Sequence, residues 1–324
     1  AADDYLLIVG REYPAGSAPI LREAGADLAQ RLIIRGEAAP ALRPLYFAAS
    51  DLFALPGDIV CETFGIALLE AMACGLPVIA SDWGPYRELV EQGVNGVLIP
   101  TWLMPGLDRI SALSPLAQRN ADHLATGQSA WVDAGALAAA LRQLLRATPE
   151  VRAAMGGAGR RRAETYASAL VHARWRQLWA IQLAEASAEP TSAAERRRAQ
   201  ADRVGHQSRY LDWYAHYATG VIGPTHRFRL NERGRTVAVR ARPVHFYDDL
   251  LPLIHREIID TLFAVLGEQP DWATCGDLVA TTAARSARAP DDVRFHLGLL
   301  LKRGLLDAAP PTCSRPSANP LPAL

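Results

Sequence analysis

Glu62 and Glu70 are the side chains of this sequence whose type and spacing are best suited to ligand chemistry. Between them lie Phe64, Gly65 and Ile66, where a helix is predicted to begin. A carboxylate can accept hydrogen bonds from two neighbouring hydroxyl groups, and the free N–H groups of a helix N-terminus bind anions. Together these groups are suited to a ligand that carries both hydroxyl and phosphate groups.

A predicted strand, loop and helix would bring these residues to one edge of a sheet. Leu52–Pro56 is a short apolar run typical of a buried parallel strand, and Gly65–Ala73 is predicted to be a helix that ends at a Gly-x-Pro sequence. Open α/β sheets bind ligands at the carboxyl edge of their strands. The alternative interpretation is structural: Glu62 would complement the helix dipole, and Glu70 would be a surface residue.

The block from Asp58 to Thr101 resembles the donor-binding signature of the family-four retaining glycosyltransferases, whose GT-B fold contains two Rossmann-like domains. The similarity is greatest to a subgroup with a D-N-I-Q-E-T-F-G-like loop and a following S-D-W-x-x-Y-R turn. The matching stretches are Asp58-Ile-Val-Cys-Glu-Thr-Phe-Gly65, Glu70-Ala-Met-Ala-Cys-Gly-Leu-Pro77, Ser81-Asp-Trp-Gly-Pro-Tyr-Arg87 and Gly93-Val-Asn-Gly96. Several motifs in one order are more specific than a pair of glutamates.

The resemblance implies a role for each candidate residue. Glu62 would hydrogen-bond the donor sugar at the catalytic centre, and Glu70 would hold the ribose of the nucleotide. The N–H groups of Phe64, Gly65 and Ile66 would face the diphosphate, where negative charge grows as the glycosidic bond breaks. The implied reaction transfers a hexose from a nucleoside diphosphate sugar to a glycan or lipid-linked acceptor. Neither a metal nor a cofactor is expected.

The fold expected for residues 1–187 is a Rossmann-like α/β domain with a parallel sheet, the C-terminal half of a GT-B enzyme. The chain begins without methionine on a strand that is the second of this domain in the family. The first strand and the acceptor domain would lie upstream, so we interpret the chain as a fragment. The expected strands are 5–10, 31–35, 51–56, 78–81 and 97–100, and the expected helices are 18–30, 40–49, 65–73, 85–91, 134–146, 149–155 and 159–185.

Three further expectations concern the second half of this domain. Asp82 precedes Pro85 and is predicted to cap a helix, while Trp83 and Tyr86 are expected to pack in the core rather than to shape a sugar pocket. Residues 101–132 are poorly periodic and are predicted to be a surface excursion. Trp175 and Trp179 lie one helical turn apart, on a helix that braces the two domains in GT-B enzymes.

A small, mostly helical, winged-helix-like module is predicted over residues 205–307, after a linker at 188–204 and before a disordered tail at 308–324. A hairpin of 227–230 with 236–239 would precede helices at 250–266, 275–284 and 290–303. Asp291 and Asp292 lie at the N-terminal end of the last helix, which is the end that would enter a DNA groove, and their negative charges would repel the phosphates. We therefore expect docking or oligomerisation, and no nucleic acid partner.

Composition restricts the remaining classes of function. The formal charge of the 324-residue chain is +0, and no apolar run approaches the roughly 20 residues of a membrane span. Its four cysteines lack metal-ligand spacing, and no D-x-D pair is present. We expect a cytoplasmic protein, and the alternative location that we consider is a peripheral contact with the inner face of the membrane. The alternative is a non-catalytic nucleotide-sugar fold that docks partners through its C-terminal module or, less favoured, binds DNA.

Overall fold

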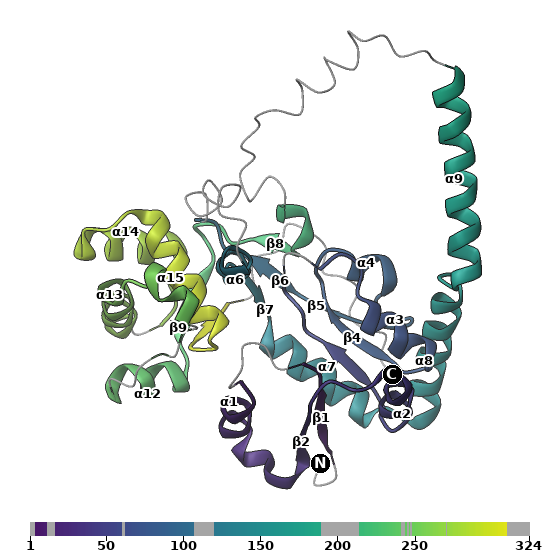
Figure 1. Cartoon of the computed structure of the whole chain (residues 1–324). Coiled ribbons are helices and arrows are strands. Elements are labelled where there is room, and N and C mark those ends of the chain that lie inside the picture. The colour runs from purple at the N-terminus through teal and green to yellow at the C-terminus, as the bar shows by residue number, and fades with distance from the viewer. Residues whose placement is uncertain are drawn as a thin grey trace. The chain divides into compact units, whose positions relative to one another are not determined.

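The structure is a computed structural model that describes residues 4–11, 17–59, 62–106, 120–188, 214–240, 244, 246, 248–269 and 271–309. It divides into two compact units, Ala1–Asp51 and Leu52–Leu324. Figure 1 labels the elements, which together form an α/β fold with parallel strand pairs, as the sequence predicted.

The first unit contains one parallel strand pair. β1 (Leu6–Val9) pairs with β2 (Leu32–Arg35) from Leu6 opposite Leu32 to Val9 opposite Arg35. The helix predicted over 18–30 is shorter, because α1 (Ser17–Ala24) ends before Gly25 and a 3-10 helix, η1 (Ala26–Arg31), follows. A second 3-10 turn, η2 (Pro40–Leu42), leads into α2 (Arg43–Ala48).

A three-stranded parallel sheet forms the part of the second unit that carries the glutamates. β3 (Phe53–Leu55), β4 (Val78–Ser81) and β5 (Gly96–Ile99) lie side by side in that order. The buried face of this sheet packs on apolar side chains of α7 (Ala134–Arg146) and α8 (Pro149–Glu164). The connections are α3 (Ile66–Ala73) and the short α4 (Tyr86–Leu89). The sheet therefore holds the start of α3 at its carboxyl edge.

A second sheet joins the middle of the chain to its C-terminal part. β6 (Thr101–Leu103) pairs antiparallel with β7 (Ala130–Val132) and parallel with β8 (Gly220–Val221). The prediction that 101–132 is only a surface excursion is therefore wrong at both ends, and α6 (Asn120–Gly127) lies between them. Thr101, Leu103 and Ala130 are buried in these strands, which single-sequence periodicity cannot show in strands of three residues.

The C-terminal elements pack around one hydrophobic core. Helices α13 (Arg256–Glu268), α14 (Cys275–Ser286) and α15 (Pro290–Lys302) lie beside a small antiparallel sheet, and all three were expected (Figure 1). That sheet has the order β10 (Ala273–Thr274), β9 (Arg227–Leu230) and β11 (Leu306–Ala308). Short 3-10 helices, η3 (Ala215–Tyr217) and η4 (Asp248–Leu253), complete the region.

The predicted hairpin in this region is wrong. Residues 236–239 belong to a helix, α12 (Glu232–Arg240), and β9 pairs with β10 and β11 instead. Asn231 starts the helix because its side-chain oxygen accepts a hydrogen bond from the N–H of Gly234 at 2.8 Å. The short alternation of Val and polar residues could not distinguish this capped helix from a strand.

Met104, which lies in the predicted donor-binding domain, belongs to the same buried core as the C-terminal helices. Predicted disorder from residue 308 also starts too early, since Ala308 is the last residue of β11. Residues 189–204 of the predicted linker and 310–324 of the predicted tail lie outside the described residues.

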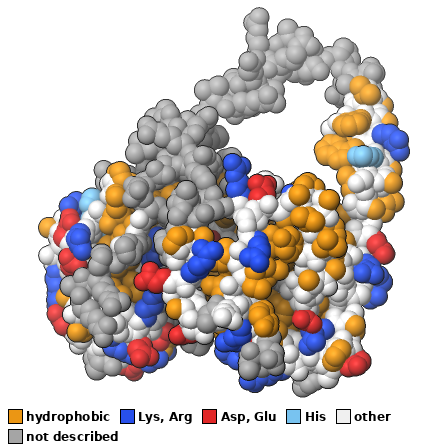
Figure 2. Space-filling model, turned by 60° about the horizontal axis from the view of Figure 1, so that its bottom comes forward, with side chains coloured by type: hydrophobic (Ala, Val, Ile, Leu, Met, Phe, Trp, Pro, Cys, Tyr) orange, Lys and Arg blue, Asp and Glu red, His pale blue; other side chains and the backbone are white. Residues whose placement is uncertain are grey.

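The long helix α9 (Ser168–Ala188) exposes apolar side chains along its length, as Figure 2 shows at the right of the view. Trp175 and Trp179 stack in a tilted arrangement with ring centroids 5.7 Å apart, and about half of each side chain is exposed. Among the described residues, no helix combines the length and the hydropathy that crossing a membrane would require.

Candidate functional site at the start of α3

The carboxylate of Glu62 lies against the first backbone N–H groups at the start of α3. Its Oε1 accepts hydrogen bonds from the N–H of Phe64 at 3.1 Å and from the N–H of Gly65 at 2.9 Å. Its Oε2 accepts a hydrogen bond from the hydroxyl of Tyr86 at 3.2 Å. Two of the three N–H groups predicted to face a diphosphate thus bind a carboxylate here. The carboxylate thus binds N–H groups just before α3, which agrees with the structural interpretation of Glu62 and shows that these donors bind a negatively charged group.

Gly65 is the N-cap of α3 and has a backbone φ of +91°, a conformation that side chains with a Cβ rarely adopt. A Cβ on Gly65 would lie 2.8 Å from the ring of Tyr86, and a Cβ on Gly57 would lie 2.7 Å from the hydroxyl of Tyr86. The two glycines therefore let one tyrosine ring pack between both ends of the loop. This packing brings the hydroxyl of Tyr86 to Glu62.

Tyr86 is 2% exposed, and burial together with the neighbouring carboxylates of Glu62 and Asp58 raises the pKa of Tyr86. Its hydroxyl consequently stays protonated at neutral pH and donates to Glu62. Sequence reasoning placed Tyr86 in the core correctly but missed this hydrogen bond. No local pattern could reveal it, because the two residues belong to different loops of the sheet.

The remaining predicted site residues lie just before α3 or on it. Phe64 packs edge-on against Tyr166, with ring centroids 5.3 Å apart, while the side chain of Ile66 is 65% exposed at the first position of α3. Glu70 lies on α3, and its side chain is partly buried. Phe64, Gly65 and Glu62 are in direct contact, and Ile66 and Glu70 follow on the same helix. The roles implied for these residues stay predictions.

Asp82 and Trp83 lie in the next loop along the sheet edge. The prediction that Asp82 caps a helix is wrong, since Pro85 is the N-cap residue of α4 and no side chain caps it. Asp82 instead forms an ion pair with Arg87 and accepts a hydrogen bond from the hydroxyl of Thr219 at 2.6 Å. The indole N–H of the fully buried Trp83 donates to the carbonyl of Ile59 at 3.1 Å.

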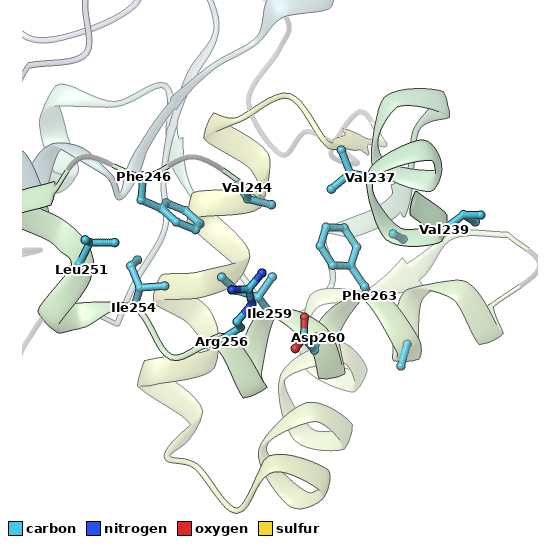
Figure 3. Close-up of a pocket in the computed structure, with 12 residues that line it drawn as sticks. Val237, Val239, Val244, Phe246, Leu251, Ile254, Arg256, Ile259, Asp260 and Phe263 are labelled. Atoms are coloured by element: carbon cyan, nitrogen blue, oxygen red, sulfur yellow. The ribbon is translucent and has the colours of Figure 1, made fainter. Parts of the chain in front are cut away.

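A cavity lies elsewhere, in the C-terminal part. It has a volume of about 850 Å³ and is walled mainly by apolar side chains of α12, α13 and the segment before α13 (Figure 3). Arg256 and Asp260 are the charged residues of its lining. None of the predicted site residues lines this cavity. Within the described residues, no three His, Cys, Asp or Glu side chains are grouped as metal ligands would be.

Comparison with known proteins gives a family match in the first third of the chain. Residues 2–105 match the family model described as "Glycosyl transferases group 1". A phosphatidyl-myo-inositol mannosyltransferase of Mycobacterium leprae is 37% identical over 98 residues, which are 30% of this chain and 25% of that protein. A D-inositol 3-phosphate glycosyltransferase of Thermobispora bispora is 33% identical over 144 residues, which are 40% of this chain and 33% of that protein.

Among solved structures, sucrose-phosphate synthase from Thermosynechococcus elongatus aligns with 54% of this chain and 39% of that chain, at 28% identity and a TM-score of 0.38. The chain spans about a quarter to a third of the length of the two curated relatives described above. The segment matched by the family model contains every predicted site residue. Residues 2–105 thus have the sequence characteristics of the group 1 glycosyl transferase family.

Proposed function

We propose that this chain carries the donor-binding part of a glycosyltransferase. The reaction would transfer a hexose from a nucleoside diphosphate sugar to a glycan or lipid-linked acceptor, with retained anomeric configuration and without a metal ion or cofactor. The observation that carries the proposal is the anion-binding start of α3, in the segment that matches the glycosyl transferase family. The acceptor and the stereochemistry are part of the proposal.

In this proposal the donor diphosphate binds at the N–H groups of Phe64, Gly65 and Ile66. Negative charge grows on the diphosphate as the glycosidic bond breaks, and a positive helix N-terminus stabilises it. Glu62 turns from the N–H groups toward hydroxyls of the sugar, because two anions compete for the same donors. Glu70, farther along α3, accepts the ribose hydroxyls in a charge-assisted hydrogen bond.

Isothermal titration of the chain with UDP, GDP, UDP-glucose and GDP-mannose tests the donor site. We expect one base to bind selectively and Glu70→Ala to weaken that nucleotide roughly 10- to 100-fold, as expected for lost hydrogen bonds to a charged group. Glu164→Ala, which changes an exposed glutamate of α8, is the matched control. Failure of all four compounds to bind, or equal affinities for Glu70→Ala and the control, contradicts the proposal.

The same titration separates the two glutamates. Glu62→Gln should bind the free nucleoside diphosphate at least as tightly, because a neutral side chain competes less for its N–H donors. It should lose the extra affinity that the sugar supplies, because the sugar hydroxyls lose their carboxylate acceptor. Glu70→Ala should weaken the free diphosphate and the sugar conjugate equally. If Glu62→Gln weakens both ligands alike, Glu62 is not the sugar-binding residue.

A further inference from the structure

Lys302, the last residue of α15, is the only lysine of the chain. Its ammonium group contacts Asp58 Oδ2 at 2.5 Å, the carbonyl oxygen of Gly127 at 2.8 Å and that of Ala130 at 3.2 Å. An ammonium group has three N–H donors, so these contacts use all of them. The side chains of Lys302 and Asp58 are 23% and 21% exposed, which limits screening of the pair by solvent.

Asp58 lies between β3 and Glu62, and the described residues of this stretch are held at three places. Lys302 binds Asp58, the indole of Trp83 binds the carbonyl of the next residue, Ile59, and Tyr86 binds Glu62. The second and third anchors come from the turn after β4, close in sequence to the loop. The first anchor comes from the far end of the chain.

The position of Lys302 is itself determined by packing. The preceding residues 297–301 of α15 are all buried, and a Cβ on Gly298 would lie 3.4 Å from Met104 Cβ. The helix is therefore in van der Waals contact with the segment after β6, and a displacement of Lys302 would disturb this buried packing. The C-terminal helices therefore present the ammonium group to Asp58 from a rigid support.

We propose that Lys302 is a positioning residue of the donor site: it fixes Asp58 and thereby the approach of the loop to Glu62, so that the C-terminal helices support donor binding. This inference rests on the proposed function of the Glu62 site. It assigns the C-terminal region a role in that site rather than a separate docking role. Lys302 itself does not touch the donor.

The test compares binding of the preferred nucleoside diphosphate sugar with stability in a set of full-chain variants. Lys302→Met keeps the aliphatic stem and removes the charge, Asp58→Asn removes the other charge, and Lys302→Arg keeps the positive charge. Arg288→Met is the matched control, because it breaks an ion pair between the segment that joins α14 to α15 and Glu257 of α13. Titrations are made where circular dichroism shows every variant to be folded.

We expect Lys302→Met and Asp58→Asn each to raise the Kd of the donor about tenfold, the size usual when a residue that orients a binding group is lost. The double variant should be no worse than either single variant, because the two residues act through one contact. Lys302→Arg should recover part of the affinity. Arg288→Met should bind like the unchanged chain.

A chemical readout tests the ion pair without any nucleotide. Lys302 carries the only side-chain amine, so acetylation by an N-hydroxysuccinimide ester, read by peptide mass spectrometry, reports on it alone. We expect slow acetylation in the unchanged chain and several-fold faster acetylation in Asp58→Asn, because the contact with Asp58 restricts access to the amine. Equal acetylation rates would contradict the contact.

Failure of the positioning role of Lys302 can be distinguished from failure of the proposed function. If the unchanged chain binds the donor and Lys302→Met binds it equally well, Lys302 has no positioning role, while the donor site stands. A loss of stability in Lys302→Met without a change in Kd leads to the same conclusion. If the unchanged chain binds no nucleotide at all, the proposed function fails, and the positioning role fails with it.

Discussion

Glu62 uses its two carboxylate oxygens for two kinds of partner, backbone N–H groups on one side and the hydroxyl of Tyr86 on the other. The tyrosine is buried, so it cannot follow the glutamate when the carboxylate turns. A ligand that draws Glu62 away must therefore replace these hydrogen bonds with its own. Hydroxyl groups of a sugar and a diphosphate together can do so, whereas a lone phosphate would leave the carboxylate without a partner.

A second buried residue, His296, has a fixed ring orientation. Its Nε2 accepts the backbone N–H of His255 at 2.8 Å, so Nδ1 carries the proton and donates to the carbonyl oxygen of Asp292 at 2.6 Å. Burial lowers the pKa of His296, and the neutral ring is the native form. The histidine therefore takes up a proton more readily in the unfolded chain than in the folded one. Its contribution to the free energy of unfolding is complete above about pH 6.5 and decreases as the pH falls below that value.

We expect His296→Gln to lower the free energy of unfolding at pH 7.5 by about 1–3 kcal/mol, because the N–H of His255 loses its acceptor. Between pH 7 and pH 5, the free energy of unfolding of the variant should also decrease less than that of the unchanged chain. Urea unfolding at each pH measures both effects. His172→Gln, at an exposed position of α9, is the control. An unchanged pH dependence in His296→Gln would exclude the buried ring as its source.

At the scale of elements, α8 packs against the end of α3 through glycines. A Cβ on Gly156 would lie 1.8 Å from the carbonyl oxygen of Gly75, and a Cβ on Gly159 would lie 3.6 Å from Met72. Arg160, on the same helix, donates to the carbonyl oxygens of Ala73 and Cys74 at 3.2 Å each, where α3 ends. Arg160 and the close glycine packing together fix the C-terminal end of α3, and the N-terminal end of the same helix forms the candidate site.

Neighbouring glycines of α8 provide a matched pair of substitutions. Gly156→Ala should destabilise the chain by about 1–3 kcal/mol or more, because the helices must separate to admit a methyl group. Gly157→Ala should stabilise it by about 0.5–1 kcal/mol, since its Cβ would meet only Arg161, at 3.8 Å, and alanine favours the helix. Thermal and urea unfolding measure both. Equal effects of the two substitutions would show that α8 does not pack this closely.

At the scale of the whole second unit, the turn after β4 and the start of β8 are connected through Thr219. Its hydroxyl donates to Asp82 and accepts the N–H of Thr101 at 2.8 Å, and its own N–H donates to the carbonyl of Thr101 at 2.6 Å. Arg87 adds a hydrogen bond to the carbonyl of His216 at 2.9 Å. The C-terminal region is thus bound to the loops of the candidate site by polar contacts as well as by its core.

Thr219→Val keeps the shape of the side chain and removes both hydroxyl hydrogen bonds. We expect the free energy of unfolding to fall by about 1–3 kcal/mol, because a partly buried carboxylate oxygen of Asp82 loses a hydrogen-bond donor and the N–H of Thr101 loses its acceptor. Thr236→Val is the control, since that hydroxyl donates only to the carbonyl one turn earlier in an exposed part of α12. Hydrogen exchange should also speed up at the amide of Thr101. A loss no larger than that of the control would contradict this connection.

The sequence was sufficient to predict strands and helices where the local pattern and the tertiary environment favour the same structure. The strands of the parallel sheet and helices such as Ala134–Arg146 were predicted within a few residues. The prediction failed where tertiary contacts overrule local signals. Glycines at 156–159 suggested a helix break, but the break lies at Thr165–Ala167, because these glycines serve close packing against α3. Asp82 likewise resembles a cap in sequence, whereas Arg87 and Thr219 bind it in the structure.

The candidate site shows the same difference between local sequence signals and tertiary contacts. Residue types and spacing alone determined the strand, the glycine turn and the helix start at which Glu62 lies, because those signals are local along the chain. Only the tertiary structure decided that Tyr86 orients Glu62 and that Lys302 reaches Asp58. Contacts between residues this distant in sequence depend on how the sheets and helices pack, and no periodicity encodes that packing.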